Sequence, residues 1–113
     1  MKNRFPGFQK CMEMMRDHDP QFQEDGFAFL RPFATAFVDE LIDEFKKETK
    51  HGLRCWILEL IGDARSPKAF EFLCEQSQSI ERAYRDWAMR GLEELDTKES
   101  RTFVWQARNA NHE

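Results

Sequence analysis

Apolar residues recur every three or four positions along most of the chain, a spacing that predicts α-helices. The clearest stripe lies between residues 32 and 47, and its apolar members are Ala34, Phe37, Val38, Leu41, Ile42 and Phe45. Pro32 suits the first turn of that helix, and Lys46 and Lys47 suit its last turn, where cations stabilise the helix dipole. No segment alternates as a half-buried strand would, so the sequence predicts an all-α fold.

Turn-forming and capping residues divide this pattern into six predicted helices. Their expected ranges are 8–16, 32–47, 51–61, 67–76, 79–95 and 97–109. Pro20 and Gly26 predict a loop over the segment DHDPQFQEDGF, and Gly62 predicts the end of the third helix. Ser66 and Thr97 are expected N-caps, and the Thr-Lys-Glu-Ser sequence at Thr97 predicts an imperfect capping box.

The second half of the chain repeats itself at an offset of 31 residues. At this offset Arg54 and Trp56 align with Arg85 and Trp87. Further pairs of similar character are Leu58–Met89, Ile61–Leu92, Ser66–Thr97, Phe72–Phe103, Leu73–Val104 and Glu75–Gln106. A period of about 20 to 50 residues built from helix pairs is typical of α-solenoids.

The two copies resemble HEAT-like repeats, in particular the short bacterial type known from phycobilisome lyase-like proteins. The residues that match this pattern in the first copy are Arg54, Ile57, Ile61, Gly62, Ala69 and Leu73. The second copy lacks the turn glycine and matches at Arg85, Ala88, Leu92 and Leu95. The resemblance covers residues 53–107 and implies a short curved array of helix pairs whose second helices line a partner-binding face.

We therefore expect one domain over residues 1–113, a short α-solenoid of HEAT-like helix pairs. Residues 1–31 are expected to form a cap-like N-terminal segment, and 32–50 to supply the helix of a degenerate repeat. Residues 51–78 and 79–109 are then the two HEAT-like pairs.

Composition and charge favour a cytoplasmic protein that does not bind membranes. The chain has 113 residues and a net charge of −4, with no apolar run near the ~20 residues of a membrane span and no signal sequence. Its three cysteines (Cys11, Cys55 and Cys74) do not form a disulfide framework. Arginines of the fifth helix alternate with acidic residues, so we do not expect a nucleic-acid interface.

Two groups of residues are candidate chemical sites. His51, Cys55 and Glu59 share one helix face and could combine a thiol nucleophile with a base, but no oxyanion-stabilising element accompanies them. The alternative is that Cys55 faces the core while the other two border it. The Asp-His-Asp sequence at residues 17–19 lacks the convergent ligands of a metal site and is expected to be a solvated loop. We therefore expect no catalytic residues, no metal and no cofactor.

The residues expected to bind a partner are acidic and lie on two helices. They are Asp39, Glu40, Asp43, Glu44, Glu71 and Glu75. Such residues are commonly an ordinary solvated face, but they can also speed association with a basic protein. Arg54, Trp56, Arg85 and Trp87 are expected to have structural roles, with the arginines bonding an acidic residue or a helix end of the adjacent unit.

These expectations favour a non-catalytic protein-binding module. Its most concrete form is a bacterial immunity or antitoxin-type inhibitor that binds and blocks a cognate toxin, for example a basic nuclease domain. The alternative is a general adaptor or assembly factor of the HEAT-repeat type. A bilin lyase-like enzyme is a third hypothesis, suggested by the resemblance alone.

Overall fold

The computed structural model describes residues 4–110, and residues 1–3 and 111–113 lie outside the described part. All regular structure within 4–110 is helical, so the all-α prediction is confirmed there. The elements are α1 (Phe8–Met15), α2 (Pro20–Leu30), the 3₁₀-helix η1 (Arg31–Phe37), α3 (Val38–Lys47), α4 (His51–Asp63), the 3₁₀-helix η2 (Pro67–Ala69), α5 (Phe70–Gln76), α6 (Arg82–Leu95) and α7 (Lys98–Ala110).

The predicted loop over residues 17–27 is wrong, because most of it forms α2. Asp19 caps this helix by accepting a hydrogen bond from the backbone N–H of Gln21 at 3.0 Å, and Pro20 occupies the first turn. Gly26 lets α2 approach α1, since a Cβ at this position would lie 2.7 Å from the Cβ of Met14. Both residues that suggested a loop therefore support a helix.

Several predicted boundaries also move, and the helix expected from residue 79 begins as α6 at Arg82. The helix expected from Pro32 begins as η1, and α3 starts only at Val38. Within η1 the Thr35 hydroxyl donates a hydrogen bond to the Ala64 carbonyl at 2.8 Å, which ties this segment to the end of α4. Helix α4 continues through Gly62 to Asp63, because Gly62 is buried against α6 rather than placed in a turn.

The 31-residue offset reappears in the backbone geometry of the two junctions that follow α4 and α6. Arg65 and Asp96 both have left-handed backbones, with φ of 49° and 53°. The next residues, Ser66 and Thr97, both cap the following turn through their side chains. Thr97 also donates its backbone N–H to the Ser100 hydroxyl at 2.8 Å, so the predicted capping box closes with serine in place of glutamate.

Two acids that are 31 residues apart, Asp63 and Glu94, each pair with an arginine. Arg31 Nε lies 3.0 Å from Asp63 Oδ2, and Arg65 Nη2 lies 3.7 Å from Glu94 Oε2. Asp63 Oδ2 is buried and receives no well-aligned hydrogen bond, so the charge of Arg31 is what compensates it. Each acid near the end of one long helix thus meets an arginine from earlier in the chain.

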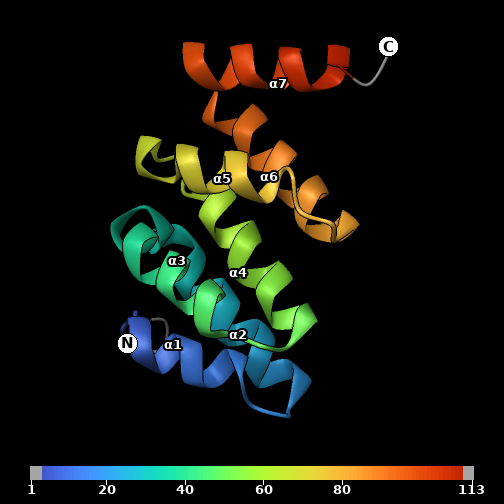
Figure 1. Ribbon diagram of the computed structural model, residues 1–113. Helices are drawn as coiled ribbons and strands as arrows, with labels where there is room; N and C mark the ends of the chain where they lie inside the picture. Colours follow the sequence, from blue (N-terminus) through green and yellow to red (C-terminus); the bar gives the residue numbers. More distant parts are fainter. Residues whose placement is uncertain (1–3, 111–113) are drawn as a thin grey trace.

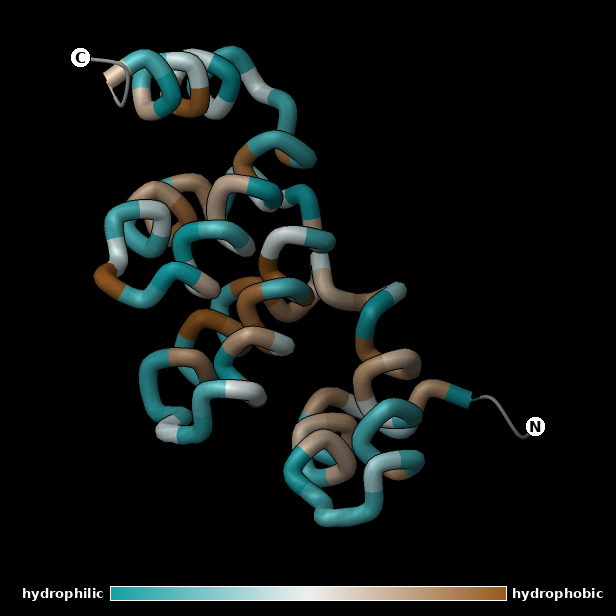
Figure 2. The backbone as a smooth tube through the Cα atoms, turned by 90° about the vertical axis from the view of Figure 1, so that its right-hand side faces the viewer, coloured by the Kyte–Doolittle hydropathy of each residue, from teal (hydrophilic) through white to brown (hydrophobic). Residues whose placement is uncertain are grey.

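The helices follow one another along an elongated molecule of 52 × 25 × 20 Å, with the two ends of the chain far apart (Figure 1). Helix α4 packs on α6, α3 on α4, and both α5 and α7 on α6. One connected apolar core extends from Phe8 to Val104. Apolar segments gather where helices face one another, while most connecting turns are hydrophilic (Figure 2).

None of the helices in the described part of the chain has both the length and the apolar character needed to cross a bilayer.

The packing of α4 on α6 predicts opposite effects for two glycines of the same helix. A Cβ at Gly62 would lie 3.0 Å from the Gly91 Cα, a backbone atom that cannot rotate away. We expect Gly62→Ala to lower the free energy of unfolding by about 1–2 kcal/mol, through overpacking. Urea unfolding followed by circular dichroism measures this change.

Gly52→Ala is the matched control, because no heavy atom lies within 4 Å of a Cβ at Gly52. We expect it to leave stability unchanged or raise it by up to about 1 kcal/mol, owing to the helix propensity of alanine. Equal effects of the two substitutions would contradict the proposed role of the Gly62–Gly91 contact.

Candidate functional site

Five of the six carboxylates predicted to bind a partner are exposed on helix α3 or helix α5. They are Asp39, Glu40, Asp43, Glu71 and Glu75, and we call them the acidic surface. The sixth, Glu44, does not belong to it. Its side chain is turned inward and buried, and its Oε1 lies 2.5 Å from Arg16 Nη2 on α1. The spacing of charges along α3 could not reveal this partner, because Arg16 is 28 residues away.

The acidic surface is largely uncompensated by the rest of the protein. Asp39 pairs with Lys68 at 3.7 Å, which places the start of α3 beside the segment that leads into α5. None of the ion pairs formed within residues 4–110 includes the other four carboxylates. Lys46 and Lys47 are exposed in the last turn of α3 and bound the surface at that end. Excess negative charge therefore faces solvent here.

An ion-pair network joins the N-terminal hairpin of α1 and α2 to α3. Arg16 pairs with Glu44 at 2.5 Å and with Glu48 at 3.3 Å. Glu48 also accepts hydrogen bonds from the backbone N–H groups of Thr49 and Lys50, each at 3.1 Å. Burial by itself raises the pKa of Glu48, but the bonds from Lys50, Arg16 and Thr49 outweigh it, so this pKa lies below its ordinary value.

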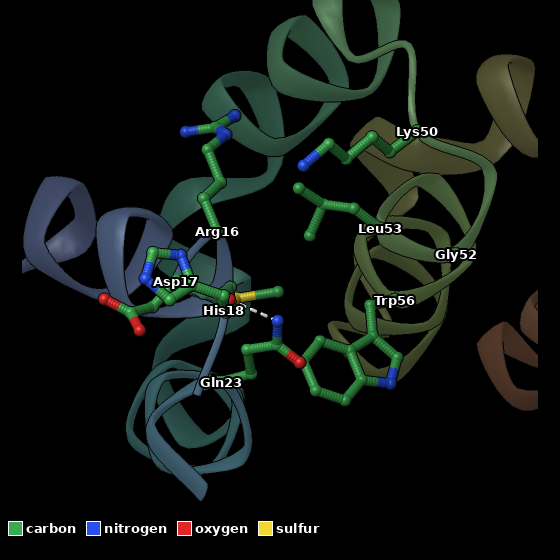
Figure 3. Close-up of a pocket in the computed structure, with 9 residues that line it drawn as sticks. Arg16, Asp17, His18, Gln23, Lys50, Gly52, Leu53 and Trp56 are labelled. Atoms are coloured by element: carbon green, nitrogen blue, oxygen red, sulfur yellow. Dashed lines mark hydrogen bonds between the residues drawn. The ribbon is translucent and has the colours of Figure 1, made fainter. Parts of the chain in front are cut away.

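A cleft of about 560 Å³ lies between this hairpin and the start of α4 (Figure 3). Its apolar wall is formed by Met15, Leu53 and Trp56. The Gln23 carboxamide faces the Trp56 indole, and Lys50 extends over the opening from the α4 side (Figure 3). Gln23 is held in place by donating a hydrogen bond to the Asp17 carbonyl. The cleft therefore combines an apolar wall with a polar rim.

The cysteine on α4 lies in a small polar cluster that differs from the predicted one. Cys55 Sγ lies 3.7 Å from His51 Nε2, and His51 Nδ1 lies 3.9 Å from a carboxylate oxygen of Glu81. Glu81 thus occupies the position that the sequence suggested for Glu59. Burial raises the pKa of the Cys55 thiol and the Glu81 carboxylate raises it further, although Arg54 opposes them. A raised pKa disfavours the thiolate, the form that acts as a nucleophile.

The aspartates of the Asp-His-Asp sequence have local structural contacts. Asp17 accepts a hydrogen bond from the backbone N–H of Asp19, and Asp19 caps α2. Within the described residues, no three or more His, Cys, Asp or Glu side chains are arranged to hold a metal ion.

The two repeated arginines bond to backbone carbonyls rather than to acidic side chains. Arg54 Nε donates to the Phe45 carbonyl at 3.1 Å, near the end of α3, and its guanidinium lies 4.0 Å from the Phe45 ring centroid. Arg85 donates to the carbonyls of Ser79 and Ile80 before α6.

The two repeated tryptophans have different neighbours. The Trp56 ring packs on Phe27 with centroids 5.1 Å apart, whereas the Trp87 ring lies under the guanidinium of Arg90.

Comparison of the chain with family models, with curated proteins and with solved structures yields no match. The class of the protein is therefore defined by its own features: an all-α protein that carries an uncompensated acidic surface and a cleft with an apolar wall.

The lowered pKa of Glu48 predicts a pH-dependent contribution to stability. Because the folded pKa is depressed, the contribution is complete above the ordinary Glu pKa of about 4.3 and is lost as pH falls through the folded value. We expect Glu48→Gln to reduce stability by about 1–2 kcal/mol at pH 7, and the difference from the unsubstituted protein to shrink below about pH 4. Thermal unfolding from pH 2 to 7 measures this difference.

Glu13→Gln is the control for this experiment, because Glu13 is exposed and makes only a 4.0 Å contact with Lys10. Its unfolding curve should match that of the unsubstituted protein at every pH. A Glu48→Gln deficit that stays constant down to pH 2 would show that the side chain acts through its shape and not its charge.

Proposed function

We propose that the fold is a short HEAT-like array of helix pairs. The support is the 31-residue offset, which recurs in sequence, in the left-handed residues Arg65 and Asp96, and in the caps that follow them. The equivalent acids Asp63 and Glu94 each pair with an arginine from earlier in the chain. In such arrays each unit contacts its neighbours, and the exposed helix faces form an extended surface.

The function that we propose is non-catalytic binding of a basic protein through the acidic surface. The observation that carries this proposal is that Glu40, Asp43, Glu71 and Glu75 are exposed, while no cation within residues 4–110 pairs with them. Uncompensated charge of one sign repels itself and contributes nothing to folding. It attracts a partner of opposite charge and raises the rate of encounter.

The most concrete form of this proposal is an immunity or antitoxin-type inhibitor that blocks a basic toxin, such as a nuclease domain. Such toxins act on a polyanion and carry exposed cations, so an acidic surface can occupy the same cations. The small size and the net charge of −4 suit this role.

Affinity capture from the native host tests the proposal. Tagged protein is exposed to lysate, washed at low and then high salt, and the retained proteins are identified. One stoichiometric basic partner whose toxic or nuclease activity is inhibited on binding supports the inhibitor. Several subunits of one larger assembly would instead support a general adaptor, and no salt-sensitive partner would overturn the role of the acidic surface.

We expect charge reversal in the acidic surface to weaken its association with the captured partner. We expect the double variant Asp43→Lys/Glu71→Lys to lower affinity by about 10- to 100-fold at low salt, chiefly through the association rate. The loss should diminish as ionic strength rises, because exposed charges are screened. Surface plasmon resonance over a salt series separates the two rates.

Glu24→Lys/Glu99→Lys is the matched control, because it makes the same change in net charge at exposed acids of α2 and α7. If both double variants lose affinity equally, net charge rather than the acidic surface is responsible.

A further inference from the structure

The cleft between the N-terminal hairpin and α4 is a second candidate binding surface, separate from the acidic surface. Met15, Leu53 and Trp56 give it an apolar wall, and the indole is held by its packing on Phe27. A volume of about 560 Å³ accommodates one or two side chains, but not a folded domain. Pockets of this kind, with a fixed aromatic ring beside a few polar groups, are where binding energy concentrates in protein interfaces.

The charges at the rim determine which side chains suit the cleft. Of the charged residues that line the cleft, Arg16 and Lys50 are cations and Asp17 is an acid. Glu44 and Glu48 pair with Arg16, and the Asp17 carboxylate accepts the Asp19 N–H. Figure 3 shows the side chains of Asp17 and His18 directed away from Trp56.

Of the two cations that line the cleft, Arg16 is paired within residues 4–110 and Lys50 is not. It is exposed, it extends over the cleft, and it takes part in no ion pair among the described residues (Figure 3). Its backbone carbonyl accepts the Arg54 N–H at the start of α4. Asp17 also lines the cleft without an ion-pair partner among the described residues, but its carboxylate is directed away from Trp56, so the charge beside the apolar wall is that of Lys50 (Figure 3).

We propose that this cleft binds a protruding segment of a partner protein that carries an apolar side chain next to an acidic one. The apolar side chain packs against Met15, Leu53 and Trp56, and the carboxylate pairs with Lys50. Gln23 supplies a carboxamide beside the indole for the backbone of the bound segment. The inference rests on the proposed function in that the occupant is a polypeptide, but it uses none of the residues of the acidic surface.

Short peptides test the cleft without the cognate partner. The probes are acetyl-Phe-Glu-amide, acetyl-Phe-Gln-amide and acetyl-Ala-Glu-amide, titrated into the isotope-labelled full chain and followed by amide and indole NMR signals. We expect acetyl-Phe-Glu-amide to give saturable shifts at Trp56, Lys50 and Gly52 with a Kd near 1 mM, about −4 kcal/mol. The other two peptides should bind about 5-fold more weakly or not at all, since each lacks one of the two interactions.

Lys50→Gln removes the charge and keeps a side chain of similar reach, and Lys46→Gln makes the same change on the exposed face of α3. We expect the preference for glutamate over glutamine to vanish in Lys50→Gln and to persist in Lys46→Gln. Unfolding curves for both variants verify that they remain folded. Absence of saturable shifts up to about 10 mM, equal binding of the Glu and Gln peptides, or an unchanged preference in Lys50→Gln would each overturn the proposal.

The two proposals fail in distinguishable ways. Asp43→Lys/Glu71→Lys leaves every residue of the cleft in place, so it should bind acetyl-Phe-Glu-amide as the unsubstituted chain does. If the peptides do not bind while that variant loses a captured partner, the cleft proposal falls and the acidic surface stands. If the peptides bind but no basic partner is retained, the reverse holds.

Discussion

The close contact of Gly62 with Gly91 fixes the distance between α4 and α6, and the remaining helices are placed relative to this pair. A Cβ on either residue would lie 3.0 Å from the Cα of the other, so the two helices approach as closely as their backbones allow. Because α3 packs on α4 and α5 packs on α6, the same contact sets the spacing of α3 and α5. The 3.7 Å pair between Asp39 and Lys68 joins α3 to η2, which leads into α5. The relative positions of the acidic residues on α3 and α5 therefore depend on the glycine contact between α4 and α6.

Much of the helical fold could be predicted from local patterns, because the 3.6-residue period and the capping residues act over short distances. The Ser66 and Thr97 caps are examples, since each bonds to a backbone N–H two or three residues away. The segment around Gly26 was mispredicted because glycine has two uses. It can end a helix, or it can let another helix approach, and only the position of α1 shows which applies. The helix end predicted at Gly62 is wrong for the same reason.

The candidate site was less predictable, because it depends on pairs of residues that are distant in sequence. In the sequence of a single helix, an exposed carboxylate cannot be told from one that forms a buried ion pair. Glu44 differs from its exposed neighbours because Arg16, next to the end of α1, pairs with it. The Cys55 cluster shows the same limit, since its carboxylate comes from Glu81 at the edge of α6 and not from Glu59 one turn away. The cleft had no signature in the sequence, because the residues that line it come from α1, α2, α4 and the segments beside them.

Net charge is a poor guide to local recognition in this protein, because internal pairing removes some charges and leaves others. Arg16 pairs with the carboxylates of Glu44 and Glu48, while Lys50, on the other side of the cleft, has no ion-pair partner among the described residues. On α3 and α5 the cations are too few, and the carboxylates remain unmatched instead. If one partner engaged both surfaces, they would contribute to different steps. The acidic surface would act at long range and raise the association rate, whereas the cleft would act only on contact and lower the dissociation rate. This division follows from geometry, because a charge on an exposed helix is felt across the solvent and an apolar wall is not.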